Sequence, residues 1–294
     1  MNGTDGANRV TRYRSIDVAG IDVAYREAGA PQAPVVLLLH GFPTSSRMFR
    51  DLIPRLSDRY RVIAPDYPGF GHSGVPDRAN FAYNFDNLTA VVERLLDRLD
   101  VGAFTPYLMD FGGPVGCRLA LKYPDRVPAL VMQNAPLYPE PPQGWWETLG
   151  RYWKEGTGER RDESRSYLSL DSLRDQYLHG VRDGSLIDPD NWIVDAALIG
   201  RPGVDEIMLD LLYDIHNNTA TFSAMRQFLR DRRPPTLVAT GANDEIFPEE
   251  VMRKILNDLP ETEFHAIDSG HFALEDSCPD IADLMRDFLG RVLP

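Results

Sequence analysis

One stretch, from Phe104 to Gly116, constrains the fold more than any other part of this 294-residue chain. It begins as a short apolar run, breaks at Gly112-Gly113 and continues with apolar residues at helical spacing, which predicts a strand, a tight turn and a helix. Asp110 stands at the turn. A turn this sharp strains the backbone of its central residue and is permitted by small neighbours. The pattern is typical of a nucleophile elbow, but with a carboxylate where serine is usually found.

The rest of the chain alternates between apolar runs and amphipathic helical patterns, which predicts a mostly parallel sheet covered by helices on both faces. Strand patterns occur at residues 13–28 (a hairpin), 35–39, 62–64, 104–109, 127–133, 235–240 and 263–267. From Leu137 to about Arg233 there is no strong strand pattern, and this segment holds all four tryptophans. We therefore expect an α/β core of residues 1–136 and 234–294, with a helical cap of residues 137–233 inserted after the sixth strand. The charged run Glu155 to Arg165 is expected to be a solvated loop of the cap.

Composition narrows the classes of function. A net charge of −13 argues against a nucleic-acid partner, which requires a basic surface. Two cysteines cannot form a disulfide framework. No apolar run approaches the length of a membrane span, and the first residues are polar without the apolar core of a signal peptide. We expect a cytoplasmic protein that acts on a small molecule, without a membrane or nucleic-acid partner. The sequence is compatible with a homodimer.

Three loops that follow apolar strands carry candidate catalytic side chains. Asp110 follows the first of these strands, Asp244 ends the turn Gly241-Ala-Asn-Asp244, and His271 lies in Ser269-Gly-His-Phe272. Ligands of open α/β sheets bind at the carboxyl ends of the strands. Each residue alone could be an ordinary turn, cap or loop residue, but the chain order nucleophile, acid, histidine favours a catalytic triad. Glu245 is an alternative to Asp244 as the acid.

The other histidines suggest no metal centre. His265 falls within a predicted strand, and His72 lies in a turn where a structural hydrogen bond is expected. His179 and His216 lie in the cap without metal-ligand spacing around them. We expect neither a metal nor an organic cofactor.

These motifs together resemble the α/β-hydrolase superfamily, in its aspartate-nucleophile branch of epoxide hydrolases and haloalkane dehalogenases. The matching segments are His40-Gly-Phe-Pro43, Asp66 to Ser73, Met109-Asp-Phe-Gly-Gly113, Asp244 and Gly270-His-Phe-Ala-Leu-Glu275. The resemblance implies an α/β-hydrolase fold, with Asp110 as nucleophile, His271 as base and Asp244 as the acid that orients it. It also implies an oxyanion hole formed by the backbone N–H groups of Phe42 and Phe111.

The chain departs from the dehalogenase pattern at two positions. Dehalogenases of this branch typically have an asparagine after the His-Gly motif and a tryptophan after the nucleophile. The side-chain N–H groups of these two residues hold the departing halide. Here the two positions are Phe42 and Phe111, which offer no side-chain donor. An anion leaving into such a pocket would be desolvated at a cost of several kcal/mol.

We therefore expect an epoxide hydrolase that forms a covalent alkyl-enzyme ester and acts on a small to medium apolar substrate. Epoxide hydrolases use cap tyrosines to protonate the opening oxygen, and Tyr177 and Tyr213 are the candidates here, with Trp146 as a further pocket residue. Three alternatives are kept: a haloalkane dehalogenase-like hydrolase, a lyase or cyclase on the same scaffold, and a ligand-binding protein.

Overall fold

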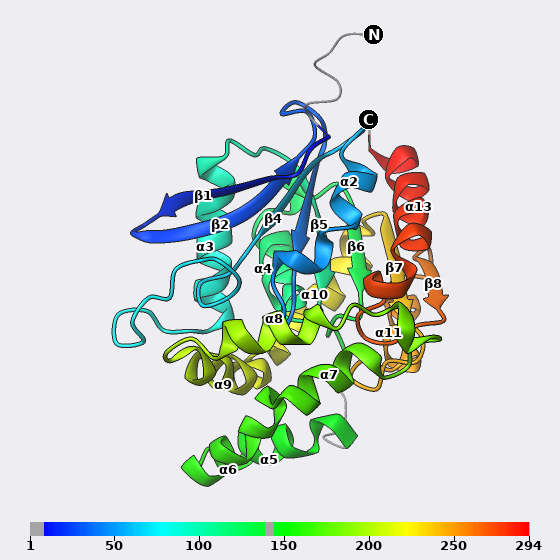
Figure 1. Ribbon diagram of the computed structural model, residues 1–294. Helices are drawn as coiled ribbons and strands as arrows, with labels where there is room; N and C mark the ends of the chain where they lie inside the picture. Colours follow the sequence, from blue (N-terminus) through cyan, green and yellow to red (C-terminus); the bar gives the residue numbers. More distant parts are fainter. Residues whose placement is uncertain (1–8, 139–143, 294) are drawn as a thin grey trace.

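A computed structural model describes residues 9–138 and 144–293 of the chain (Figure 1). Eight strands form one sheet in the order β1-β2-β4-β3-β5-β6-β7-β8. The strands are β1 (Arg12–Val18), β2 (Ile21–Ala28), β3 (Val35–Leu39), β4 (Arg61–Pro65), β5 (Phe104–Met109), β6 (Leu130–Gln133), β7 (Thr236–Gly241) and β8 (Glu263–Ile267). β2 pairs antiparallel with β1 and β4, and from β4 to β8 all neighbouring strands run parallel. The predicted α/β fold with a mostly parallel sheet is confirmed.

Helices cover both faces of this sheet, which explains why the central strands are uninterrupted apolar runs. Every residue of β3 and β5 is buried, as expected for parallel strands that are covered on both sides. The core helices are α2 (Leu52–Leu56), α3 (Phe85–Arg98), α4 (Gly112–Lys122), α10 (Thr219–Arg232), α11 (Glu249–Met252), α12 (Ile255–Asp258) and α13 (Leu274–Val292). The apolar residues of α2 and α13 join one hydrophobic cluster, and those of α3, α4 and α10 join the other.

The segment between β6 and β7 contains helices joined by loops and no strand in its described part, residues 134–138 and 144–235. Besides α10 it contains α5 (Glu147–Glu155), α6 (Gly158–Glu163), α7 (Leu170–Leu178), α8 (Asp190–Ile199) and α9 (Val204–Asp214). Helices α5 to α9 lie together at one end of the sheet, at the bottom of Figure 1. Within the described residues no helix has both the length and the apolarity needed to cross a membrane.

The prediction that the charged run of this segment is a loop was wrong. The side chain of Thr157 accepts the N–H of Arg160 and caps α6, which occupies most of the run. Arg161 and Arg165 both bond the carboxylate of Glu206 in α9, and these bonds lower the pKa of Glu206 to about 2. The run is therefore a helix whose arginines are held by a neighbouring helix.

Candidate active site

Asp110 lies at the junction of β5 and α4 with a left-handed backbone, at φ +48°. Non-glycine residues rarely adopt this conformation, which costs on the order of 1–3 kcal/mol and is often found at functional sites. Two glycines make the close approach possible. A Cβ on Gly112 would lie 2.2 Å from the carbonyl oxygen of Leu39, and one on Gly41 would lie 2.3 Å from the Cβ of Asp110. The strand–turn–helix predicted for this stretch therefore places one carboxylate at the end of β5.

The carboxylate of Asp110 is buried and held by backbone amides. The N–H of Phe42 donates to its Oδ1 at 2.6 Å. Burial raises the pKa of Asp110 to about 6, against the opposing effects of the His271 charge and of the amides of Phe42 and Phe111. The nearby carboxylate of Asp244 raises this pKa further. Asp110 is thus a weakly solvated carboxylate whose Oδ1 is fixed by a backbone donor.

His271 is hydrogen-bonded to Asp244, with 2.9 Å between Nδ1 and Oδ2. Because a carboxylate can only accept, Nδ1 carries the proton, and Nε2, which is buried and has no partner among the described residues, can accept one. Burial alone would lower the pKa of His271, but the carboxylates of Asp244 and Asp110 outweigh it and raise the pKa. The arrangement is that of a base oriented by an acid.

The acid of this pair is Asp244 and not Glu245. The N–H of Ile246 donates to Oδ1 of Asp244 at 2.8 Å, which closes the turn after β7 and directs the other oxygen to His271. The side chain of Glu245 is exposed, and its nearest charged partner is His179, at 3.9 Å. The structure therefore brings together the nucleophile, acid and base candidates Asp110, Asp244 and His271.

Asn134 is a functional residue that the sequence reasoning missed. It directly follows β6 with a left-handed backbone, at φ +41°. Its side-chain amide donates to Oδ2 of Asp244 at 2.7 Å, and its carbonyl accepts the N–H of Asp110 at 3.0 Å. The sequence signal was a buried polar pair, Gln133-Asn134, at the end of an apolar strand, and Asn is one of the few residues that tolerates this conformation.

The side chains of Phe42 and Phe111 form an apolar wall beside the carboxylate. Their ring centroids lie 5.7 Å apart, and Phe111 also makes edge contacts with the rings of Phe70 and Phe85. Both residues are buried. Neither side chain has a donor, so the only donors that these two residues can present to the site are their backbone amides.

Tyr67, in the loop after β4, was not considered as a site residue from the sequence. Its ring packs on His40, with 4.3 Å between centroids, and it is fully buried. Its hydroxyl is buried without a hydrogen-bond partner among the described residues. Burial raises the pKa of Tyr67 well above its usual range, and the charge of Asp110 raises it further. A neutral phenol with an unused O–H therefore lies within the electrostatic influence of the nucleophile candidate.

A mostly apolar cavity of about 420 Å³ is lined by residues of the helical segment together with Pro136 and Phe247, and Asp110 and His271 are not among its lining residues. Its walls include Pro136, Trp146, Trp153, His216, Phe222 and Phe247. The ring of Phe247 lies 5.8 Å from the ring of His271, so the cavity and the histidine share a wall. Trp146 is placed in this wall because its indole N–H donates to the carbonyl of Ile246, two residues after Asp244, at 2.7 Å.

The two tyrosines proposed as cap acids lie elsewhere in the structure. The hydroxyl of Tyr177 donates to Oδ2 of Asp195 at 2.6 Å, and its ring stacks on Phe272 at 4.2 Å. Tyr213 lines a different hollow with Arg78 and Phe81, and its ring lies 4.6 Å from that of Tyr152. Neither residue is part of the cavity wall beside His271, so an acid role for either one stays a prediction.

Comparison with known proteins fits this geometry. Residues 34–167 and 212–277 match the family described as alpha/beta hydrolase fold. An uncharacterized hydrolase of Saccharomyces cerevisiae is 41% identical over 94% of this chain and 97% of its own. A cis-3-alkyl-4-alkyloxetan-2-one decarboxylase of Xanthomonas campestris is 31% identical over 92% of this chain and 93% of its own. The haloalkane dehalogenase DatA of Agrobacterium tumefaciens superposes with a TM-score of 0.78 at 22% identity, covering 96% of this chain and 97% of DatA.

The chain therefore belongs to the α/β-hydrolase family. A haloalkane dehalogenase of Bradyrhizobium diazoefficiens is 40% identical over 41% of this chain and 38% of its own. The present chain is a hydrolase of α/β fold.

Proposed function

We propose that the protein is an epoxide hydrolase in which Asp110 forms a covalent ester with the substrate. The observation that supports this most directly is the carboxylate itself, held on a left-handed turn at the end of β5 with the Phe42 amide 2.6 Å from Oδ1. One oxygen is fixed by this donor, so the other is the one that attacks. The His271–Asp244 pair nearby supplies the base for the second step.

A carboxylate nucleophile favours an sp³ carbon as the electrophile. Attack on an ordinary ester would give an anhydride, which is more reactive than the ester it replaces. Attack on a ring carbon of an epoxide forms one C–O bond, breaks the strained one and leaves an alkyl ester on Asp110. His271 Nε2 then takes a proton from water as the water oxygen attacks the ester carbonyl of Asp110. His271 returns this proton to the departing alkoxide oxygen, and the diol leaves.

The amides of Phe42 and Phe111 have a role in that second step. Hydrolysis of the ester places negative charge on the carbonyl oxygen of Asp110, which the Phe42 N–H already contacts in the free protein. A preorganised donor of this kind contributes about 3–4 kcal/mol to transition-state stabilisation. The same backbone group thus holds the nucleophile before the reaction and the oxyanion during it.

The apolar character of the site favours an epoxide over a haloalkane. A halide ion leaves with its full charge, and neither Phe42 nor Phe111 offers a side-chain donor to it. An epoxide oxygen stays attached to the substrate and needs only one hydrogen-bond donor. The cavity of about 420 Å³, with its aromatic walls, suits a neutral substrate of small to medium size.

Tyr67 is a candidate for that donor in addition to Tyr177 and Tyr213. Its O–H has no hydrogen-bond partner among the described residues, and burial and the charge of Asp110 raise its pKa. The O–H of Tyr177, by contrast, donates to Asp195. A buried phenol stays neutral at working pH and so can donate to the oxygen as the ring opens.

A strained β-lactone is a second candidate substrate, because of the 31% identity to an oxetan-2-one decarboxylase over nearly the whole chain. Attack by Asp110 on the sp³ ring carbon that bears oxygen would release a carboxylate, which needs neither a halide site nor a proton donor. Loss of CO₂ could then form the alkene and expel Asp110 as a carboxylate. No water is consumed, so this would be a lyase reaction.

Trapping the ester separates these candidates. The variant His271→Gln, mixed with a terminal alkyl epoxide, should gain the mass of the epoxide on the peptide that contains Asp110, while the wild type releases the diol. The control Asp110→Asn should gain nothing. With a cis-3,4-dialkyl β-lactone, release of alkene and CO₂ by the wild type would favour the lyase. If the wild type turns over the epoxide and His271→Gln gives no adduct with it, the covalent epoxide mechanism is refuted.

A further inference from the structure

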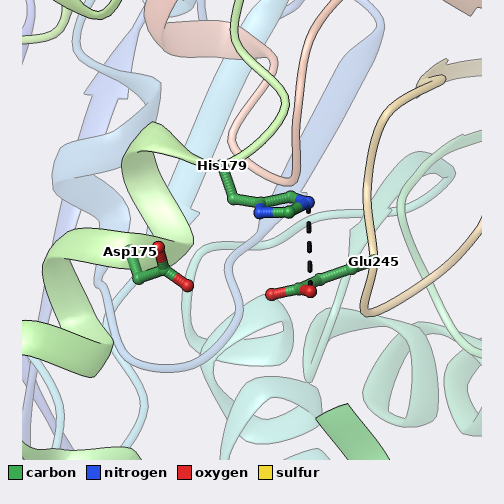
Figure 2. Close-up of side chains that lie close together, drawn as sticks. All are labelled: Asp175, His179 and Glu245. Carbon is green, nitrogen blue, oxygen red and sulfur yellow. Dashed lines mark ion pairs between the residues drawn. The ribbon is translucent and has the colours of Figure 1, made fainter. Parts of the chain in front are cut away.

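Three exposed side chains from two distant segments lie together beside the active site (Figure 2). Asp175 and His179 are four residues apart at the end of α7, and Glu245 follows Asp244 after β7. One carboxylate oxygen from each acid and one ring nitrogen of His179 all lie within 4.8 Å of one another. The nearest approach of His179 and Glu245 is 3.9 Å, between Nε2 and Oε2.

Close backbone packing holds the two segments in place. The side-chain amide of Asn243 donates to the carbonyl of Gly180 at 2.8 Å and to Asp268 at 3.0 Å. Gly270 lies against the turn after α7 so closely that a Cβ would fall 1.9 Å from the carbonyl oxygen of His179. The spacing of the three side chains is therefore set by packed backbone, while the exposed side chains themselves can rotate.

The two carboxylates of this cluster have no arginine partner. Among the described residues neither Asp175 nor Glu245 forms an ion pair with an arginine. Most other carboxylates of the cap, such as Glu206, Asp210 and Glu163, have arginine partners. The whole chain carries a net charge of −13. Two carboxylates without an arginine partner and an imidazole therefore form a local concentration of metal-ligand atoms in a field that attracts cations.

We propose that Asp175, His179 and Glu245 form a binding site for a divalent transition metal of the Zn²⁺ type. Imidazole and carboxylate are both ligands of zinc, at about 2.0–2.2 Å. Ligand atoms on such an ion lie roughly 3.3 Å apart, so the three groups, now within 4.8 Å of one another, need to close by at most about 1.5 Å. The bound ion ties α7 to the loop that carries Asp244, and water completes its coordination. No local sequence pattern indicates this site, because Glu245 is distant from α7 along the chain.

The test is a calorimetric titration of the full chain, free of any affinity tag, with ZnCl₂ at neutral pH. We expect one ion per chain with a dissociation constant in the micromolar range or below. His179→Ala and Glu245→Gln should each weaken binding at least tenfold. All three ligand side chains are exposed, so these variants keep the fold, which an unchanged Tm without metal verifies. His72→Ala, another exposed histidine, is the matched control and should bind zinc as the wild type does.

Two further readouts make the proposal specific. Co²⁺ bound at the site should give visible absorption that is lost in His179→Ala, and saturating Zn²⁺ should raise the Tm of the wild type but not of that variant. The proposal is overturned if the wild type binds no zinc, if His179→Ala binds it equally well, or if half an ion binds per chain with a doubled molecular mass. The last result would mean that zinc bridges two molecules. None of these measurements depends on the substrate.

Discussion

Replacing Asp110 by asparagine should make the protein more stable near neutral pH while abolishing its turnover. The buried carboxylate has a pKa of about 6 in the folded protein, against about 3.9 in an unfolded chain. The unfolded state therefore loses its proton first, and between these two values each pH unit costs the folded state about 1.4 kcal/mol. A raised acid pKa means that stability is lost as pH rises through this window, and the loss is complete above about pH 6.

The expected increase in the free energy of unfolding follows from the difference between the folded and unfolded pKa values of Asp110. About two units of pKa correspond to roughly 3 kcal/mol near pH 8, and to only about 1 kcal/mol near pH 4.5, where the folded carboxyl is still protonated. Asparagine mimics the neutral acid, and its carbonyl oxygen can accept the Phe42 N–H in place of Oδ1. Asp110→Asn should therefore be the more stable protein by up to these amounts.

Urea unfolding followed by tryptophan fluorescence at both pH values measures the difference. The control is Asp244→Asn, because Asp244 accepts bonds from Asn134, Ile246 and His271, and its amide would face the Asn134 donor. That variant should be less stable than the wild type. If Asp110→Asn is equally stable or less stable near pH 8, burial of the carboxylate is not the dominant effect and the reasoning fails.

Three further outcomes are expected. The rate of ester formation should fall as pH drops through about 6, because Asp110 becomes protonated; a rate that stays constant down to about pH 5 in single-turnover experiments would contradict this. Tyr67→Phe should slow ester formation roughly a hundredfold if it donates to the opening epoxide, with hydrolysis of the preformed ester little changed, and a wild-type rate would return the role to Tyr177 or Tyr213. Chloride and bromide should leave tryptophan fluorescence unchanged up to millimolar concentrations, since Phe42 and Phe111 present no side-chain donors; saturable quenching would restore the dehalogenase hypothesis.

Local patterns in the sequence were sufficient to predict the fold and the nucleophile elbow at Asp110. The run Phe104 to Met109, followed by Asp110 and two glycines, specifies a strand, a left-handed turn and a helix through elementary backbone sterics. Asp244 could not be separated from Glu245 in the same way, because the choice depends on the Ile246 N–H, which fixes the carboxylate of Asp244.

Residues whose role depends on contacts between distant segments could not be identified from local sequence patterns. Asn134 matters because β6 lies between β5 and β7, so its backbone reaches Asp110 and its side chain reaches Asp244. Tyr67 is distinguished only by the absence of a partner for its buried hydroxyl. Tyr177 is a candidate because it is a tyrosine of the predicted cap, and its place in the sequence does not reveal that Asp195 accepts its O–H.

The position of Asn134 also has a consequence for how such a chain can diversify. The helical segment between β6 and β7, called the excursion below, starts just after Asn134 and ends at Thr236, where β7 begins. The distances among Asp110, Asp244 and His271 are set by the hydrogen bonds of β5, β6, β7 and β8, none of which passes through the excursion. New sequences in α5, whose Gly150, Trp153 and Lys154 line the cavity, would therefore remodel its walls while the reacting groups keep their spacing. Selection for a new substrate and preservation of the chemistry can act on separate parts of one chain.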